Sequence, residues 1–487
     1  MSESRNGANQ SRGLPKSQLI GLVVGALFLL MTLFFPAPET MGQEAWAALG
    51  LMLLMATWWS TEAIPIPATA MLPIVLVPAL GLGSVSAATS PYAHPIIFLF
   101  LGGFTLGLAM QRWNLHRRIA LLTLKAVGDK PKRQIAGFML ATAFLSMWVS
   151  NTATAIMMLP IGLSVIAMAD GSNPDGVRRY ATALLLAIAY SASIGGIATL
   201  IGTPPNALLA AYLSENQGIS VGFAQWMLIG VPVTVVMLAL AWWWLTRRDF
   251  GLAHQGDSGD LIRDELAALG PLGKGEKLVG VVFLITAAAW IFRPLLSDGL
   301  MPWLSDTGIA IAAAIAMFLI PVDTRERQFL MDWETAKGIP WGVLLLFGGG
   351  LAMAGVISSS GLAEWIAGSL GAAGTLPTLL LIAIVAGVII FLTEVTSNTA
   401  TAAAFLPLLG ALAMSQGVSP LLLTVPAAIA ASCAFMMPVA TPPNAIVFSS
   451  GDMKIGDMIS AGFALNLMGI VVVTLLCYAL LGIVFTL

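Results

Sequence analysis

Two short polar motifs occur twice in this chain, and each copy interrupts a long apolar stretch. The tripeptide Ser150-Asn151-Thr152 returns 247 positions later (397 − 150) as Ser397-Asn398-Thr399. The segment Thr203-Pro204-Pro205-Asn206 returns as Thr441-Pro442-Pro443-Asn444. Polar, helix-breaking sequence at corresponding places in the two halves of a membrane chain is typical of the binding site of a secondary transporter.

The residue types in these motifs suit both a small cation and an anion. A Pro-Pro pair lacks two amide donors and breaks a helix, so the carbonyl groups just before it, near Gly202 and Ala440, are left free. Together with hydroxyl and amide oxygens, these carbonyls are ligands for a hard cation such as sodium. A helix that begins inside the membrane also presents free N–H groups and a positive dipole end, which favour an anion. The motifs therefore predict cation sites beside an anion site.

The distribution of charge favours coupling between the two ligands. The segments 134–177 and 376–453 contain no Lys, Arg or His. A divalent anion bound there would meet no fixed positive side chain, and an uncompensated charge inside a membrane is expensive. Bound cations are the natural compensation. Glu394 is the one carboxylate near a tripeptide, and it could bind an ion, cap a helical hairpin or face an extracellular vestibule.

The composition is that of a membrane protein and excludes a soluble domain. Of the 487 residues, 58% are hydrophobic and 9% are charged, whereas soluble domains carry about 25% charged residues. The mean hydropathy is +0.90. With about 20 residues for each spanning helix, the chain has room for roughly ten to twelve spans.

Apolar windows predict an all-α polytopic fold with two kinds of interruption. The tracts 134–168 and 376–414 contain the Ser-Asn-Thr motifs and are predicted to be re-entrant helical hairpins with the motif at the tip. The tracts 178–212 and 420–450 contain Thr-Pro-Pro-Asn and are predicted to be broken spanning helices. Simple spans are expected near 18–35, 44–60, 66–82, 95–111, 225–245, 278–296, 307–321, 340–357 and 458–486. The total is eleven spanning segments plus two hairpins.

Positive charge supports this topology. If the N-terminus is cytoplasmic and the sides alternate, 21 of the 22 Lys and Arg residues are cytoplasmic, with Arg293 as the exception. Positive residues stay cytoplasmic during insertion. The two hairpins then open to opposite sides, so the halves are inverted repeats and the C-terminus is periplasmic. Trp242-Trp243-Trp244, followed by Arg247 and Arg248, is predicted to lie at the membrane interface.

The motifs resemble those of the divalent anion:sodium symporters, a family that carries dicarboxylates, citrate or sulfate. The stretch Ala431–Ala440, followed by Asn444, Ile446 and Val447, also matches that family. The resemblance extends from Glu62 to the last span. It implies a homodimer in a bacterial inner membrane that works by an elevator mechanism, in which a transport domain moves against a fixed scaffold.

The resemblance also implies a domain division and a set of site residues. Residues 1–133 would form the scaffold of the first repeat and 134–250 its transport domain; residues 251–375 would form the linker and second scaffold, and 376–487 the second transport domain. One sodium ion would be bound by Ser146, Ser150, Asn151 and Gly202, and a second by Thr393, Ser397, Asn398 and Ala440. The substrate carboxylates would meet Asn151, Thr152, Thr203, Asn398, Thr399, Thr441 and Pro442.

The function expected from these features is sodium-coupled import of C4-dicarboxylates such as succinate, malate and fumarate. A sodium-independent dicarboxylate or citrate exchanger, or a sodium:sulfate symporter, is the alternative within the same fold. An enzyme is not expected, because no His lies near either motif to serve as a base or metal ligand. A channel would be expected to show rings of filter residues instead of two broken, inverted halves.

Overall fold

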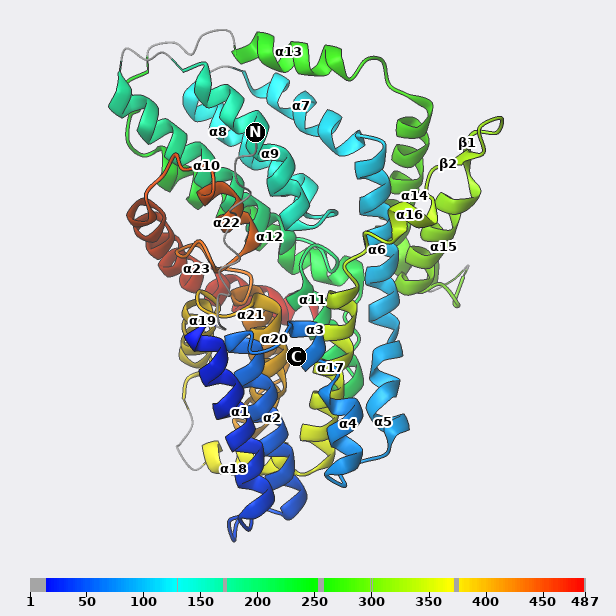
Figure 1. Ribbon diagram of the computed structural model, residues 1–487, viewed down its shortest axis with the longest axis vertical. Helices are drawn as coiled ribbons and strands as arrows, with labels where there is room; N and C mark the ends of the chain where they lie inside the picture. Colours follow the sequence, from blue (N-terminus) through cyan, green and yellow to red (C-terminus); the bar gives the residue numbers. More distant parts are fainter. Residues whose placement is uncertain are drawn as a thin grey trace, which may run out of the picture.

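The computed structural model describes residues 15–128, 130–169, 173–252, 258–297, 299, 301–371 and 376–485. Arg5 and Arg12, two of the 21 positive residues predicted to be cytoplasmic, lie outside these ranges. Figure 1 shows α7 and α13 at one end of the molecule and α18 at the opposite end. The first helices are α1 (Lys16–Phe34), α2 (Gln43–Thr61), α3 (Ile66–Thr69), α4 (Leu72–Ala79), α5 (Val85–Thr89), the 3₁₀ helix η1 (Ser90–Ala93) and α6 (Pro95–Arg112).

The span predicted at 66–82 is divided into the short helices α3 and α4. Pro73 lies in the first turn of α4, where its missing N–H is not needed, and it cannot continue a helix from α3. The carbonyl of Ala70, at the break, accepts a hydrogen bond from the Tyr92 hydroxyl. A single hydropathy window could not locate this break because the whole stretch is apolar.

The rest of the first half contains the first pair of motifs. Its helices α8 and α9 pack against each other and are joined by the segment 147–150, so the tripeptide begins at the turn. Helix α10 ends at Gly196, and the chain runs without helix through 197–203 before α11 begins at the proline pair. The elements are α7 (Leu115–Val127), α8 (Pro131–Ser146), α9 (Asn151–Ala167), α10 (Pro174–Gly196), α11 (Pro204–Gln217) and α12 (Phe223–Thr246).

The second half repeats this order of elements. Helix α20 begins within the second tripeptide, at Asn398, and α19 ends shortly before it. The segment 431–441 separates α21 from α22. The antiparallel pair β1–β2 departs from the all-α expectation. The elements are α13 (Ser258–Ala268), α14 (Lys274–Ser297), α15 (Asp306–Leu319), β1 (Pro321–Asp323), β2 (Gln328–Phe329), α16 (Trp333–Ala336), α17 (Trp341–Ser359), α18 (Leu362–Gly371), α19 (Thr378–Thr393), α20 (Asn398–Ser415), α21 (Leu421–Ala430), α22 (Pro442–Phe448) and α23 (Ile455–Val484).

Many of these helices are apolar enough for a membrane. Among the described residues, seven helical segments are long and apolar enough to span one: α1, α5–α6, α12, α14, α17, α20 and α23. Shorter apolar helices include α9, α15, α19 and α21. The expectation of a helical, polytopic membrane protein is therefore confirmed.

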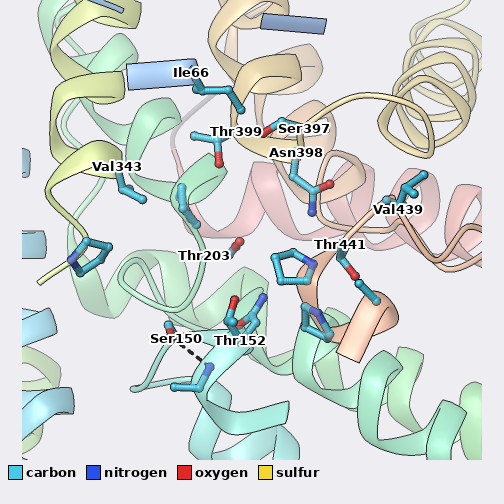
Figure 2. A pocket seen from close by; sticks show the side chains of 18 of the residues that line it. Ile66, Ser150, Thr152, Thr203, Val343, Ser397, Asn398, Thr399, Val439 and Thr441 are labelled. Carbon is cyan, nitrogen blue, oxygen red and sulfur yellow. Dashed lines mark hydrogen bonds between the residues drawn. The ribbon is translucent and has the colours of Figure 1, made fainter. Parts of the chain in front are cut away.

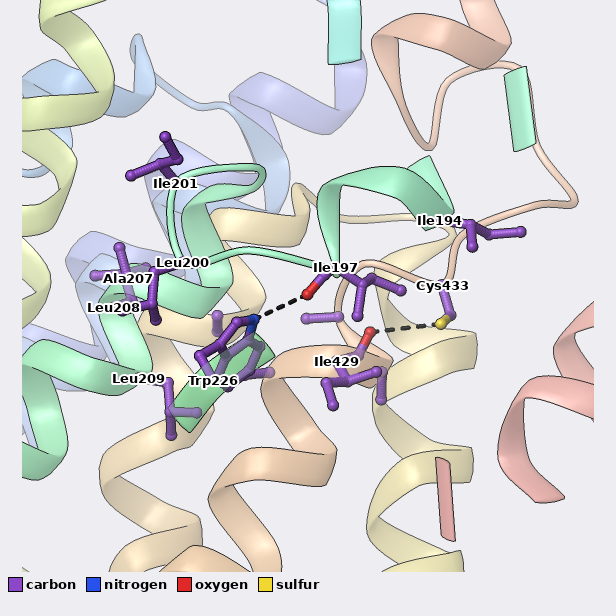
Figure 3. Close-up of a cluster of buried hydrophobic side chains, with 14 of the residues drawn as sticks. Ile194, Ile197, Leu200, Ile201, Ala207, Leu208, Leu209, Trp226, Ile429 and Cys433 are labelled. Carbon is purple, nitrogen blue, oxygen red and sulfur yellow. Dashed lines mark hydrogen bonds between the residues drawn. The ribbon is translucent and has the colours of Figure 1, made fainter. Parts of the chain in front are cut away.

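Both halves contribute to the core around the broken helices. Figure 3 shows Ile194, Ile197 and Trp226 of the first half beside Ile429 and Cys433 of the second. All five are fully buried. The indole Nε1 of Trp226 donates a hydrogen bond of 2.9 Å to the carbonyl oxygen of Ile197, just past the end of α10. The apolar cluster thus holds the irregular segments in place and also satisfies one of their free carbonyl groups.

Candidate functional site

The four motif segments line one cavity of about 1040 Å³. Figure 2 shows Ser150 and Thr152 on one side and the second tripeptide on the other, with Thr203 and Thr441 between them. Predicted site residues on its wall are Ser150, Asn151, Thr152, Gly202, Thr203, Ser397, Asn398, Thr399, Ala440, Thr441 and Pro442. The two remaining predicted residues, Ser146 and Thr393, are fully buried and contact the wall from behind.

Ser146 is part of a cluster of oxygen atoms in the first half. Its Oγ lies 2.5 Å from the Oδ1 atom of Asn151 and 2.6 Å from the carbonyl oxygen of Ala192. The same end of the Asn151 amide is 3.1 Å from that carbonyl oxygen and 3.3 Å from the carbonyl oxygen of Gly202. If the amide turns over, its NH₂ group donates to these oxygens. With Oδ1 facing them, four oxygens converge, and oxygen atoms are the ligands that a hard cation prefers.

The second half has a matching cluster around Thr393. Its Oγ1 lies 2.7 Å from Asn398 Oδ1 and 3.0 Å from the carbonyl oxygen of Ala431, and its single hydroxyl proton can be donated to either of them. Thr393 and Ser146 are separated by the same 247 positions as the tripeptides (393 − 146). The structure therefore brings a hydroxyl, an amide oxygen and a backbone carbonyl together twice, once in each half.

Among the helices that begin at the cavity, three of 14 or more residues start at the motifs. Ser150, Ser397 and Thr203 are the N-cap residues of α9, α20 and α11. Ser150 Oγ accepts a hydrogen bond of 3.2 Å from the N–H of Ala153, whereas Ser397 makes no such side-chain cap. Each helix start directs its positive dipole end at the cavity. Glu62 is the one charged side chain among the described residues of the wall.

The asparagines of the two Thr-Pro-Pro-Asn motifs brace the broken helices. Asn206 Nδ2 donates to the carbonyl oxygens of Gly196 at 3.1 Å and Thr199 at 2.8 Å. Asn444 Nδ2 donates to those of Ala434 at 3.2 Å and Met437 at 3.0 Å. Both side chains are fully buried. Each asparagine thus holds the carbonyl groups that an unwound helix leaves free, a role that sequence reasoning missed.

Glu394 has a role that differs from the three considered from the sequence. Its buried carboxylate accepts hydrogen bonds from three successive backbone N–H groups, those of Phe435 (2.7 Å), Met436 (2.9 Å) and Met437 (3.0 Å). The side-chain amide of Asn466 donates a fourth, at 2.8 Å. Glu394 is not on the cavity wall. It joins the end of α19 to the irregular segment 431–441 and to α23.

An apolar helical chain with helix breaks, oxygen clusters and helix starts around one cavity is a membrane transporter in its architecture. Residues 16–487 match the family described as the sodium:sulfate symporter transmembrane region, and the chain belongs to that family. The membership confirms the resemblance inferred from the motifs. It also confirms a transporter of a sodium-coupled family, and not an enzyme, as the class of protein.

Similar proteins support this family membership. The sodium-dependent dicarboxylate transporter SdcS of Staphylococcus saprophyticus is 44% identical over 478 residues, which is 95% of this chain and 91% of the relative. SdcS of Staphylococcus aureus strain USA300 is 44% identical over 482 residues, or 96% and 92% of the two chains.

Two solved structures share the fold at low identity. The Alcanivorax borkumensis YdaH transporter has a TM-score of 0.60 at 15% identity and covers 96% of this chain and 99% of its own. MtrF of Neisseria gonorrhoeae, described within a class of antimetabolite efflux pumps, has a TM-score of 0.59 at 14% identity, with 96% and 95% covered. These likenesses concern the fold alone.

Proposed function

We propose that this protein imports C4-dicarboxylates such as succinate, malate and fumarate together with sodium. The observation that carries the proposal is the pair of oxygen clusters beside a cavity whose described wall has no basic side chain. A dianion in such a cavity needs positive charge from bound cations and from helix starts. Sodium bound at the two clusters supplies it. The 44% identical SdcS proteins, named as sodium-dependent dicarboxylate transporters, agree with this choice of substrate.

The two sodium sites are proposed to use the predicted ligands. In the first, the ligands are Ser146, Ser150, Asn151 and the carbonyl of Gly202; in the second, they are Thr393, Ser397, Asn398 and the carbonyl of Ala440. Asn151 and Asn398 can contact both ligands, because Oδ1 suits a cation and Nδ2 suits a carboxylate. The substrate would lie between the tripeptides against Thr152 and Thr399, with Thr203, Thr441 and Pro442 beside it.

The domain division and the elevator mechanism remain part of the proposal. The cavity wall includes Gln18 near the start of α1, Thr61 at the end of α2 and Gln111 near the end of α6. All three helix ends are cytoplasmic in the topology inferred from positive charge. The conformation would then be open to the cytoplasm, and import would require the hairpins and broken helices to move against the scaffold of a dimer in a bacterial inner membrane.

Uptake of labelled succinate into proteoliposomes tests the coupling. An inward sodium gradient is expected to drive accumulation, and replacing sodium with potassium is expected to abolish it. Uptake that is indifferent to sodium would reject symport and favour a dicarboxylate exchanger.

Competition in the same assay tests the substrate. Unlabelled fumarate and malate are expected to compete with succinate at similar concentrations, and sulfate at far higher ones. Sulfate is the relevant competitor because the family description names it. Equal competition by sulfate would favour the sodium:sulfate alternative.

A further inference from the structure

A second cavity, of about 330 Å³, shares no lining residue with the cavity between the motifs. Its wall is formed by the beginning of α10, the end of α12 with the segment that follows it, and the beginning of α23. Four arginines line it: Arg178 and Arg179 from α10, and Arg247 and Arg248 from the end of α12. These two pairs are 69 positions apart (247 − 178) and meet because their helices pack together.

These arginines have no carboxylate partner among the described residues. None of them is in an ion pair within the described parts of the chain. Arg247 lies over the Trp244 ring at 3.2 Å and donates to the Trp244 carbonyl oxygen at 2.9 Å. Arg179 donates to the Phe250 carbonyl oxygen at 3.4 Å. Such contacts position guanidinium groups without neutralising them.

The cavity is positive overall although one carboxylate lines it. Asp457 is on the wall, and its Oδ2 accepts a hydrogen bond of 3.2 Å from the N–H of Lys454 at the start of α23. Four guanidinium groups therefore face one carboxylate that also caps a helix. Topology requires positive residues near cytoplasmic helix ends, but it does not require four of them to converge on one hollow from two separate segments.

We propose that this cavity binds a phosphate-bearing anion, with an anionic lipid whose headgroup carries two separate phosphates as its source. The planar guanidinium group donates paired hydrogen bonds that match phosphate oxygens. Trp242 and Trp243 are exposed on the same end of α12, and such aromatic side chains lie at the depth of lipid headgroups. Basic pockets between helices at this depth suit cardiolipin-like lipids. A soluble polyphosphate offers the same chemistry and is tested beside the lipid.

Binding to the purified, delipidated protein tests the proposal independently of transport. Cardiolipin binding is measured by native mass spectrometry and pyrophosphate binding by calorimetry. The double variant Arg178→Gln/Arg247→Gln is expected to bind cardiolipin about 30-fold more weakly, since each basic residue contributes roughly a factor of five at an anionic lipid surface. The matched control is Arg325→Gln/Arg327→Gln, which removes the same charge from the exposed turn between β1 and β2 and is expected to change affinity less than about threefold.

Each outcome decides the proposal. Selective loss of cardiolipin binding in the cavity variant supports a lipid site, and selective loss of pyrophosphate binding without lipid binding assigns the phosphate site to a soluble ligand. Equal loss in both double variants, or no binding of either probe by the wild type, overturns it. If the glutamine variant does not fold, Arg178→Lys/Arg247→Lys keeps the charge but not the paired donors. Weaker cardiolipin binding by that variant supports the site, and unchanged binding overturns it.

Discussion

Asn466 donates a hydrogen bond of 2.8 Å to the buried carboxylate of Glu394, although the two residues lie 72 positions apart. The same carboxylate accepts the N–H groups of residues 435–437. At the corresponding place in the first half (394 − 247) the chain has Met147. The halves therefore share the asparagine contacts within their broken helices but add different ones: Glu394 and Asn466 in the second half, and Trp226 in the first.

Glu394→Gln is expected to destabilise the folded protein by about 1.5–3 kcal/mol, because hydrogen bonds to a charged acceptor are the stronger ones and an amide presents an NH₂ group to some of these donors. Thermal unfolding in detergent measures the change. Met147→Gln introduces the same side chain at the corresponding position and is the control. Equal stability of Glu394→Gln and the wild type would contradict the bracing role.

Asn206→Asp is expected to be strongly damaging, although the two side chains have nearly the same size. The aspartate has no NH₂ group, so its oxygens would face the carbonyl oxygens of Gly196 and Thr199 at hydrogen-bonding distance. A buried, uncompensated charge is strongly unfavourable. We expect little folded protein, measured as the monodisperse yield after purification. Asn206→Ala is expected to retain more folded protein, and the opposite order would argue against the brace.

The sequence predicted the helices and their interruptions better than it predicted the contacts that stabilise them. Apolar windows located α12 and α17 to within a few residues, because hydropathy and chain length fix a span. The family resemblance brought Ser146 and Thr393 into consideration, and both lie beside the asparagine of their tripeptide. The partners of Glu394 could not be predicted, because they are backbone groups far along the chain whose positions depend on tertiary packing.

Asn151→Ala and Asn398→Ala are each expected to abolish transport. Each asparagine is proposed to contact one sodium ion and one substrate carboxylate, so a single deletion damages both. A lost hydrogen bond to a charged group corresponds to about 1.5–3 kcal/mol, or roughly ten- to a hundredfold in binding. Uptake normalised to folded protein measures the effect. Wild-type sodium and succinate dependences in either variant would remove that residue from the proposed site.

Substitutions behind the cavity wall should affect mainly sodium binding, and substitutions on the wall should affect mainly succinate binding. Ser146→Ala and Thr393→Ala are expected to raise the sodium concentration needed for half-maximal uptake and leave substrate preference unchanged, because both hydroxyls are buried behind the cavity. Thr152→Ala and Thr399→Ala are expected to weaken succinate binding more than sodium binding. If all four variants merely lowered stability while both concentration dependences stayed at wild-type values, these residues would be structural.

The rate of uptake should depend on the concentration of the succinate dianion. The described wall offers no basic side chain, so the charge of the substrate has to match the bound sodium and the helix starts. With carboxylic acid pKa values of roughly 4–6, succinate becomes increasingly monoanionic below about pH 5.5. The apparent affinity for total succinate is therefore expected to fall as the pH falls. Citrate should show the opposite trend if its dianion is accepted. Affinity that tracks the succinate monoanion would contradict the charge argument.

The two halves offer a paired test of the first sodium site, because Gly202 and Ala440 are equivalent positions with different side chains. They share the offset of the Thr-Pro-Pro-Asn motifs (440 − 202 = 444 − 206). A Cβ atom on Gly202 would collide with the backbone carbonyl oxygen of Gly196, which no side-chain rotation can relieve. Gly202→Ala should therefore displace the carbonyl proposed to bind sodium.

We expect Gly202→Ala to raise the sodium concentration needed for half-maximal uptake at least about tenfold, the loss that corresponds to roughly 1.4 kcal/mol of binding energy. Ala440→Gly creates no collision and is expected to cost only about 0.4–1 kcal/mol of stability through added freedom of the unfolded chain. Its sodium dependence should stay close to that of the wild type. Equal sodium dependence in the two variants would mean that the carbonyl of Gly202 is not a ligand, because its position is what the first substitution changes and the second does not.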